Sequence, residues 1–112
     1  MHIIEVLGLP PLSEEQAEKL EADIVAVAVH VIGYNLKNTG LAISLRQEIK
    51  RWHLGESIVV KVTEAPVLQE YVLETLAPAL GNIVSNSFPK AHVVCLARKY
   101  DHNQNVFWSS KL

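Results

Sequence analysis

The stretch GLAISLRQEIKRWHLGE, from Gly40 to Glu56, decides how the chain is interpreted. It opens with apolar and β-branched residues typical of a strand, Leu41–Leu45, and continues into a basic, aromatic turn over Arg46–Ser57. Patterns typical of a strand and a helix precede this stretch, and similar patterns follow it. We therefore predict that it closes one β-α-β unit and leads into a second.

The first half shows a strand followed by a capped helix. His2–Leu7 is an apolar run that Gly8 and two prolines are expected to end. Ser13 and Gln16 have the spacing of a capping box, so a helix is predicted to start after Ser13. Gly33 is expected to end it in a left-handed conformation. The helix face predicted to be buried consists of Ala17, Leu20, Ile24, Val27, Ala28 and Val31.

The second half repeats this order. Ile58–Val62 predicts a strand, Pro66 suits the first position of a second helix, and Ala91–Ala97 predicts a fourth strand. Pro78 removes a helical hydrogen bond, so a kink or break is expected near Thr75. The buried face of this helix is predicted to consist of Leu68, Tyr71, Val72, Thr75, Leu76, Ala79, Leu80 and Ile83.

Composition restricts the class of protein. The 112 residues suit one domain, and the formal charge of −2 provides no electrostatic attraction to nucleic acid. The single cysteine, Cys95, lies in an apolar run and is expected to pack as a small core residue, which fits a cytoplasmic protein. No stretch has the roughly 18 consecutive apolar residues of a membrane span, so no membrane association is expected.

The order β-α-β, β-α-β predicts an α+β fold in a single domain, 1–112, with units 1–56 and 57–112. We expect a four-stranded mixed sheet with two helices on one face. Two architectures share this order: the ferredoxin-like sandwich and a pair of fused tautomerase-type units.

The sequence resembles the tautomerase superfamily, which includes 4-oxalocrotonate tautomerase and macrophage migration inhibitory factor. Ser13–Gln16 is similar to the family's opening of its first helix. Glu48–Gly55 is similar to its acidic residue, short spacer, aromatic residue and glycine-rich hairpin. Fused members of the family also have two units in a chain of this length. The resemblance implies a homotrimer and proton transfer next to a carbonyl by an N-terminal proline, with arginines that hold a substrate carboxylate and without a cofactor.

The chain departs from this family at two positions. His2 follows Met1, and the size of His2 should prevent removal of the initiator, so no N-terminal proline is expected. Leu12 stands where oxalocrotonate-type members have a substrate arginine. The candidate catalytic residues are therefore Met1 and His2, whose α-amine and imidazole titrate near ~7.7–8.0 and ~6.5. The candidate substrate-binding residues are Arg46, Arg51, Trp52 and Arg98.

No metal site is expected, because the histidines and Cys95 lack zinc-like spacing. The leading hypothesis is a tautomerase-superfamily protein with weak or altered keto–enol isomerase activity on a small carboxylated molecule. The alternatives are a non-catalytic trimeric assembly or ligand-binding protein on the same scaffold and, third, a ferredoxin-like regulatory domain.

Overall fold

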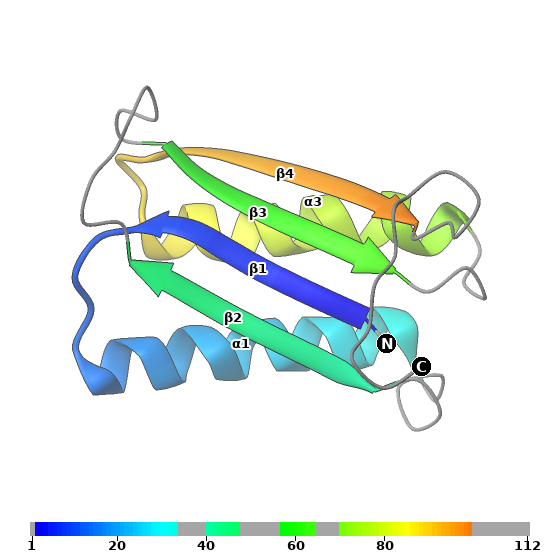
Figure 1. Ribbon diagram of the computed structural model, residues 1–112, viewed down its shortest axis with the longest axis horizontal. Helices are drawn as coiled ribbons and strands as arrows, with labels where there is room; N and C mark the ends of the chain where they lie inside the picture. Colours follow the sequence, from blue (N-terminus) through cyan, green and yellow to red (C-terminus); the bar gives the residue numbers. More distant parts are fainter. Residues whose placement is uncertain (1, 34–39, 48–56, 65–69, 100–112) are drawn as a thin grey trace, which may run out of the picture.

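The computed structural model describes residues 2–33, 40–47, 57–64 and 70–99. Its elements follow the predicted order, with two β-α-β units (Figure 1). They are β1 (His2–Leu9), α1 (Glu14–Ile32), β2 (Leu41–Gln47), β3 (Ser57–Glu64), α3 (Glu70–Ser87) and β4 (His92–Lys99).

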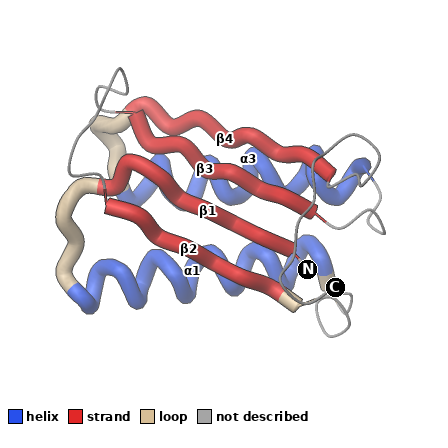
Figure 2. Tube along the Cα trace, viewed as in Figure 1, coloured by secondary structure: helices blue, strands red, loops and turns tan. Residues whose placement is uncertain are grey.

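The four strands form one mixed sheet in the order β2-β1-β3-β4. The pairs β1–β2 and β3–β4 are parallel, whereas the central pair β1–β3 is antiparallel. Both helices lie on one face of this sheet, as predicted (Figure 2). Although β2 and β3 are consecutive in the chain, β1 lies between them. The ferredoxin-like alternative, which was to be supported by a hairpin of these two strands, is therefore wrong.

The hydrophobic core lies between the sheet and the two helices. Alternate residues of β1 and β3 point to this side, because successive side chains of a strand face opposite ways. Of the residues predicted to be buried in α1, Leu20, Ile24 and Ala28 are fully buried, and Val27 and Val31 pack at the margin of the core. The fully buried apolar residues of the described chain are Ile4, Val6, Leu9, Leu20, Ile24, Ala28, Ile32, Ile58, Val60, Val62, Leu76, Leu80 and Val84.

The start of α1 confirms the predicted capping box. The backbone N–H of Gln16 donates to Ser13 Oγ at 3.1 Å, and the backbone N–H of Ser13 donates to Gln16 Oε1 at 2.9 Å. At the other end, Gly33 donates its N–H to the Val29 carbonyl at 2.9 Å. Its φ of 71° is positive as expected, but its ψ of −145° differs from the predicted left-handed helical conformation.

β1 continues past the glycine that was expected to end it. The pairing with β2 shifts by one residue between Val6↔Leu45 and Leu9↔Gln47, which is a β-bulge. Gly8 lies in the bulge with φ +83°. An added Cβ there would lie 2.7 Å from the Ser57 carbonyl oxygen of β3. The bulge turns Leu9 onto the core side, where it is 1% exposed.

α3 runs without interruption through Pro78, so the break predicted near Thr75 is wrong. Pro78 lies on the exposed side of the helix, where water can bond the carbonyl that has no N–H partner. Thr75 is also exposed, contrary to prediction, and Val84 completes the buried face instead. The expected start at Pro66 lies outside the described residues. No helix in the described part of the chain is long and apolar enough to cross a membrane.

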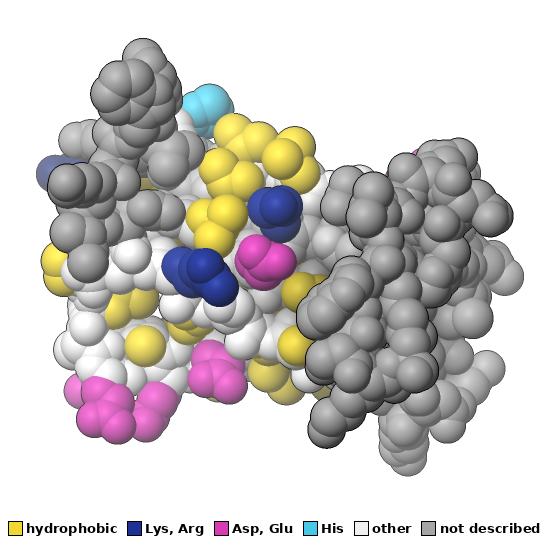
Figure 3. Space-filling view, viewed as in Figure 1, with side chains coloured by type: hydrophobic (Ala, Val, Ile, Leu, Met, Phe, Trp, Pro, Cys, Tyr) yellow, Lys and Arg dark blue, Asp and Glu magenta, His cyan; other side chains and the backbone are white. Residues whose placement is uncertain are grey.

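The sheet face away from the helices, here called the open face, combines apolar and charged residues (Figure 3). The strand register arranges its positions in rows across β1, β3 and β4. These rows are Leu7–Val59–Val94, Glu5–Lys61–Leu96 and Ile3–Thr63–Arg98. Leu96 is 54% exposed, which is unusual for a large apolar side chain in the middle of a strand.

Candidate functional site

The predicted catalytic residue His2 begins β1, a central strand of the sheet. Its backbone N–H donates to the Gly40 carbonyl at 3.1 Å, and it pairs with Leu41 of β2. The side chain is 0% exposed and is the one polar group among the fully buried side chains of the described residues. The start of β1 is thus held within the sheet. The sequence predicted His2 in a strand but did not indicate this burial or the Gly40 carbonyl as a partner.

The environment of His2 favours its neutral form. Burial lowers the pKa of His2 because it removes water from the charged imidazolium, and the positive charge of the N-terminal amine lowers it further. A neutral imidazole has one nitrogen that accepts a proton and one that donates. The imidazole of His2 is therefore uncharged near neutral pH, and it is fully buried.

Arg98 lies at the same end of the sheet as His2. It pairs with Thr63 of β3, which in turn pairs with Ile3 of β1. The backbone positions of Arg98 and Ile3 therefore belong to one row, two strands apart and next to His2. Strands lie about 4.8 Å apart, so this row spans roughly 10 Å.

Arg46 lies at the opposite end of the sheet. β2 begins at Leu41, level with His2, and Arg46 is five residues further along, or about 16 Å at the usual rise of a strand. Its side chain is exposed, and its Nε donates to Ser44 Oγ at 3.5 Å. A single chain does not bring Arg46 and His2 together.

Leu12, which stands where the resemblance would place a substrate arginine, also lies far from His2. It follows the end of β1, a strand of eight residues and therefore about 23 Å long. Leu12 is partly buried and packs against the hydrophobic core. A residue at this position reaches the start of β1 only from another copy of the chain.

The remaining predicted site residues, Met1, Arg51 and Trp52, lie outside the described residues. Burial raises the pKa of the Cys95 thiol, which favours an inert thiol packed against the core over a nucleophile. Within the described ranges, no group of three or more His, Cys, Asp or Glu side chains is placed to hold a metal ion.

No protein-family model and no curated protein matches the sequence. Several solved structures do match the fold. A fused 4-OT, described as a wild-type asymmetric trimer, has a TM-score of 0.73 and 15% identity over 94% of this chain and 91% of its own. A second, described as a symmetric trimer, has a TM-score of 0.70 and 18% identity over 88% and 85%.

MIF2 of Leishmania major has a TM-score of 0.69 at 8% identity over 96% of this chain and 93% of its own. The chain therefore has the fold of the tautomerase superfamily. This confirms, at the level of fold, the resemblance inferred from Ser13–Gln16 and Glu48–Gly55.

Proposed function

We propose that this chain is a tautomerase-type protein without a catalytic proline, with weak or altered keto–enol isomerase activity on a small carboxylated molecule. One observation carries the proposal: the start of β1, where His2 is buried on the helix side, lies at the end of the sheet whose open face contains the Arg98 position. The similarity of its fold to the 4-OT and MIF2 structures also supports the proposal.

In the proposed reaction, proton transfer next to a carbonyl uses the α-amine of Met1, with the buried imidazole of His2 as a positioning residue. An unperturbed α-amine titrates near ~7.7–8.0, so a fraction is neutral and able to accept a proton at physiological pH. A primary amine replaces the family's secondary amine, and Leu12 replaces an arginine. Both changes favour slow turnover.

We propose that Arg98 binds the substrate carboxylate, since a guanidinium matches its two oxygens. Arg46 lies about 16 Å from His2 along the sheet, so it would act from a neighbouring copy in the assembly. Arg51 and Trp52 belong to the segment that follows β2 and are proposed to line the same intersubunit pocket.

The activity is tested with phenylenolpyruvate and 2-hydroxymuconate, followed by ultraviolet absorbance. We expect slow isomerisation that is abolished when the α-amine is carbamylated. Arg98→Ala should lower kcat/KM about 10- to 100-fold, because a hydrogen bond to a charged group contributes about 1.5–3 kcal/mol. Lys90→Ala, which removes a cation at the opposite end of the sheet, is the control and should leave kcat/KM unchanged. Turnover that survives blocking of the amine would refute the proposed role of Met1.

The second candidate function is a trimeric assembly or small-ligand-binding protein that has lost the chemistry. The open face favours it, because the exposed Leu96 and the apolar Leu7–Val59–Val94 row suit burial against other copies. Among the described strands, β2 and β4 are also sheet edges, which assembly would protect. A trimeric mass by sedimentation, no turnover, and saturable carboxylate binding lost in Arg46→Ala or Trp52→Ala would support this candidate. A monomeric mass would contradict both candidates.

A further inference from the structure

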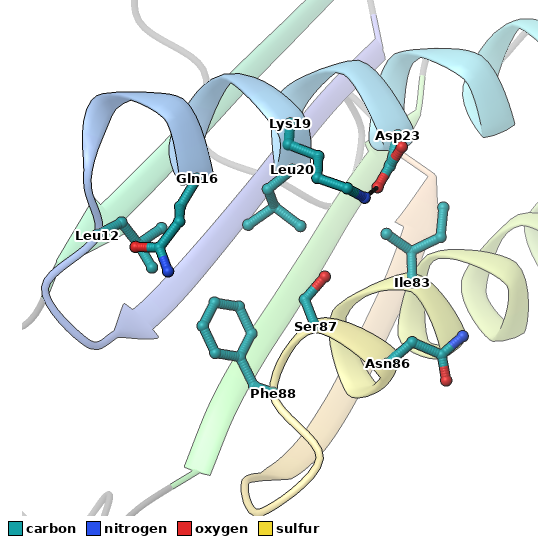
Figure 4. Close-up of a pocket in the computed structure, with 9 residues that line it drawn as sticks. All are labelled: Leu12, Gln16, Lys19, Leu20, Asp23, Ile83, Asn86, Ser87 and Phe88. Carbon is teal, nitrogen blue, oxygen red and sulfur yellow. Dashed lines mark hydrogen bonds and ion pairs between the residues drawn. The ribbon is translucent and has the colours of Figure 1, made fainter.

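A cleft with a volume of about 460 Å³ lies between the first half of α1 and the end of α3 (Figure 4). This volume falls within the roughly 300–1,000 Å³ typical of small-molecule pockets. The cleft is on the helix side of the sheet, and its α1 residues belong to the end of that helix farther from His2. It is therefore separate from the site proposed above.

Apolar side chains from both helices form the inside of this interhelical cleft. Leu20 of α1 is 3% exposed and forms part of the core. Ile83 and Phe88 project from the other side into the space between the helices, and Leu12 closes one end (Figure 4). The backbone N–H of Phe88 donates to the Val84 carbonyl at 2.9 Å, which holds the aromatic residue at the end of α3. The partly buried side chains of Leu12, Ile83 and Phe88 offer an apolar surface to a ligand, and Leu20 lies beneath them in the core.

Gln16 gives the cleft a hydrogen-bond donor of fixed orientation. Its Oε1 must face Ser13, because it accepts the backbone N–H of that residue at 2.9 Å. The amide nitrogen therefore points the other way, toward Phe88, as Figure 4 shows. The capping box of α1 thus directs an N–H group into the cleft.

The charged groups at the rim neutralise each other. Lys19 Nζ lies 3.0 Å from Asp23 Oδ2, one helical turn apart. Because the pair has no net charge, it gives neither an anionic nor a cationic ligand a net electrostatic attraction. The Ser87 hydroxyl, which points into the gap between the helices, adds an uncharged polar group (Figure 4). This combination favours an uncharged ligand.

We propose that the interhelical cleft binds a small, uncharged molecule with a flat apolar body and a carbonyl group that accepts a hydrogen bond from Gln16. The apolar part of the ligand packs on Leu12, Ile83 and Phe88, and the carbonyl oxygen faces the Gln16 amide. Because the cleft and the open face lie on opposite sides of the sheet, packing of copies through the open face leaves the cleft accessible.

The test compares three probes of nearly the same shape by ¹H–¹⁵N correlation NMR on the full chain. Acetophenone has the required carbonyl, ethylbenzene lacks it, and benzoate has a charge. We expect saturable shifts with acetophenone, centred on the Gln16 side-chain amide and residues 83–88. Ethylbenzene and benzoate should bind more weakly. The readout is independent of catalysis, so its outcome does not depend on the isomerase proposal.

Two variants locate the binding. Gln16→Glu keeps an acceptor for the capping box but removes the N–H donor, and should weaken acetophenone binding about two- to tenfold. Ser87→Phe fills the cleft and should abolish saturation. Ser85→Phe places the same side chain at an exposed position of the same helix, outside the cleft lining, and should leave binding unchanged.

The proposal is overturned if acetophenone does not saturate below its solubility limit. It is also overturned if benzoate binds more tightly than acetophenone, or if Gln16→Glu and Ser87→Phe, both folded by circular dichroism, bind acetophenone like the unmodified chain.

Discussion

The substitution Gly8→Ala tests whether the β-bulge in β1 depends on glycine. Gly8 has φ +83°, and a Cβ added there would lie 2.7 Å from the Ser57 carbonyl oxygen. That oxygen belongs to the backbone of the neighbouring strand, so relief requires movement of β1 or β3 and not rotation of a side chain. The substitution therefore adds a steric clash to an unfavourable backbone conformation.

The two costs can be separated. A left-handed conformation costs an L residue roughly 1–2 kcal/mol. Forcing an extra methyl group into packed structure costs roughly 1–3 kcal/mol more. We expect Gly8→Ala to lower the free energy of unfolding by about 2–5 kcal/mol. At roughly 0.05–0.15 kcal/mol per residue, the whole chain is stable by about 6–17 kcal/mol.

Urea unfolding at a fixed protein concentration, followed by circular dichroism, measures this loss. Gly40→Ala is the matched control, because Gly40 also has a positive φ, +77°, but has no atom within 4 Å of an added Cβ. The control should lose only the conformational part, about 1–2 kcal/mol. Equal losses at the two positions would refute the argument that close approach to Ser57 requires glycine.

Two further predictions concern His2 and the open face. The pKa of His2 is lower in the folded chain than in the unfolded chain, so the unfolded chain binds more protons below about pH 6.5. Acidification should therefore reduce the free energy of unfolding, by at most about 1.4 kcal/mol per pH unit. His2→Gln should lack this contribution in urea titrations from pH 7.5 to 5, and an unchanged pH dependence would contradict it. If copies pack through the open face, Leu96→Glu should shift sedimentation toward the monomer, whereas Val29→Glu, at a similarly exposed apolar residue on α1, should not. Equal effects of the two changes would argue against that interface.

The sequence predicted the order of the elements and the first helix because both depend on local patterns. The spacing of Ser13 and Gln16 identified the capping box, since both partners lie within one helical turn. The end of β1 could not be predicted in the same way. A glycine after an apolar run usually signals a turn. Gly8 instead belongs to a bulge beside Ser57, a residue far along the chain.

The candidate site was less predictable, because its geometry depends on the strand order. His2 and Arg98 lie at one end of the sheet only because β1 pairs with β3 and β3 with β4. The parallel register of β1 and β2 separates Arg46 from His2. Nothing in the local sequence near Gln16 indicated a cleft, since the residues opposite it come from the end of α3.

The central antiparallel pair also determines how the chain can be divided. Each parallel pair, β1–β2 and β3–β4, lies within one half of the chain together with its own helix. Among the described residues, the ladder between the halves is β1–β3, supported by contacts between α1 and α3. A cut between Gln47 and Ser57 would thus separate two fragments without breaking a ladder inside either one. The fold is therefore suited to fragment complementation, in which reassembly depends on the β1–β3 pairing and on the core shared by α1 and α3.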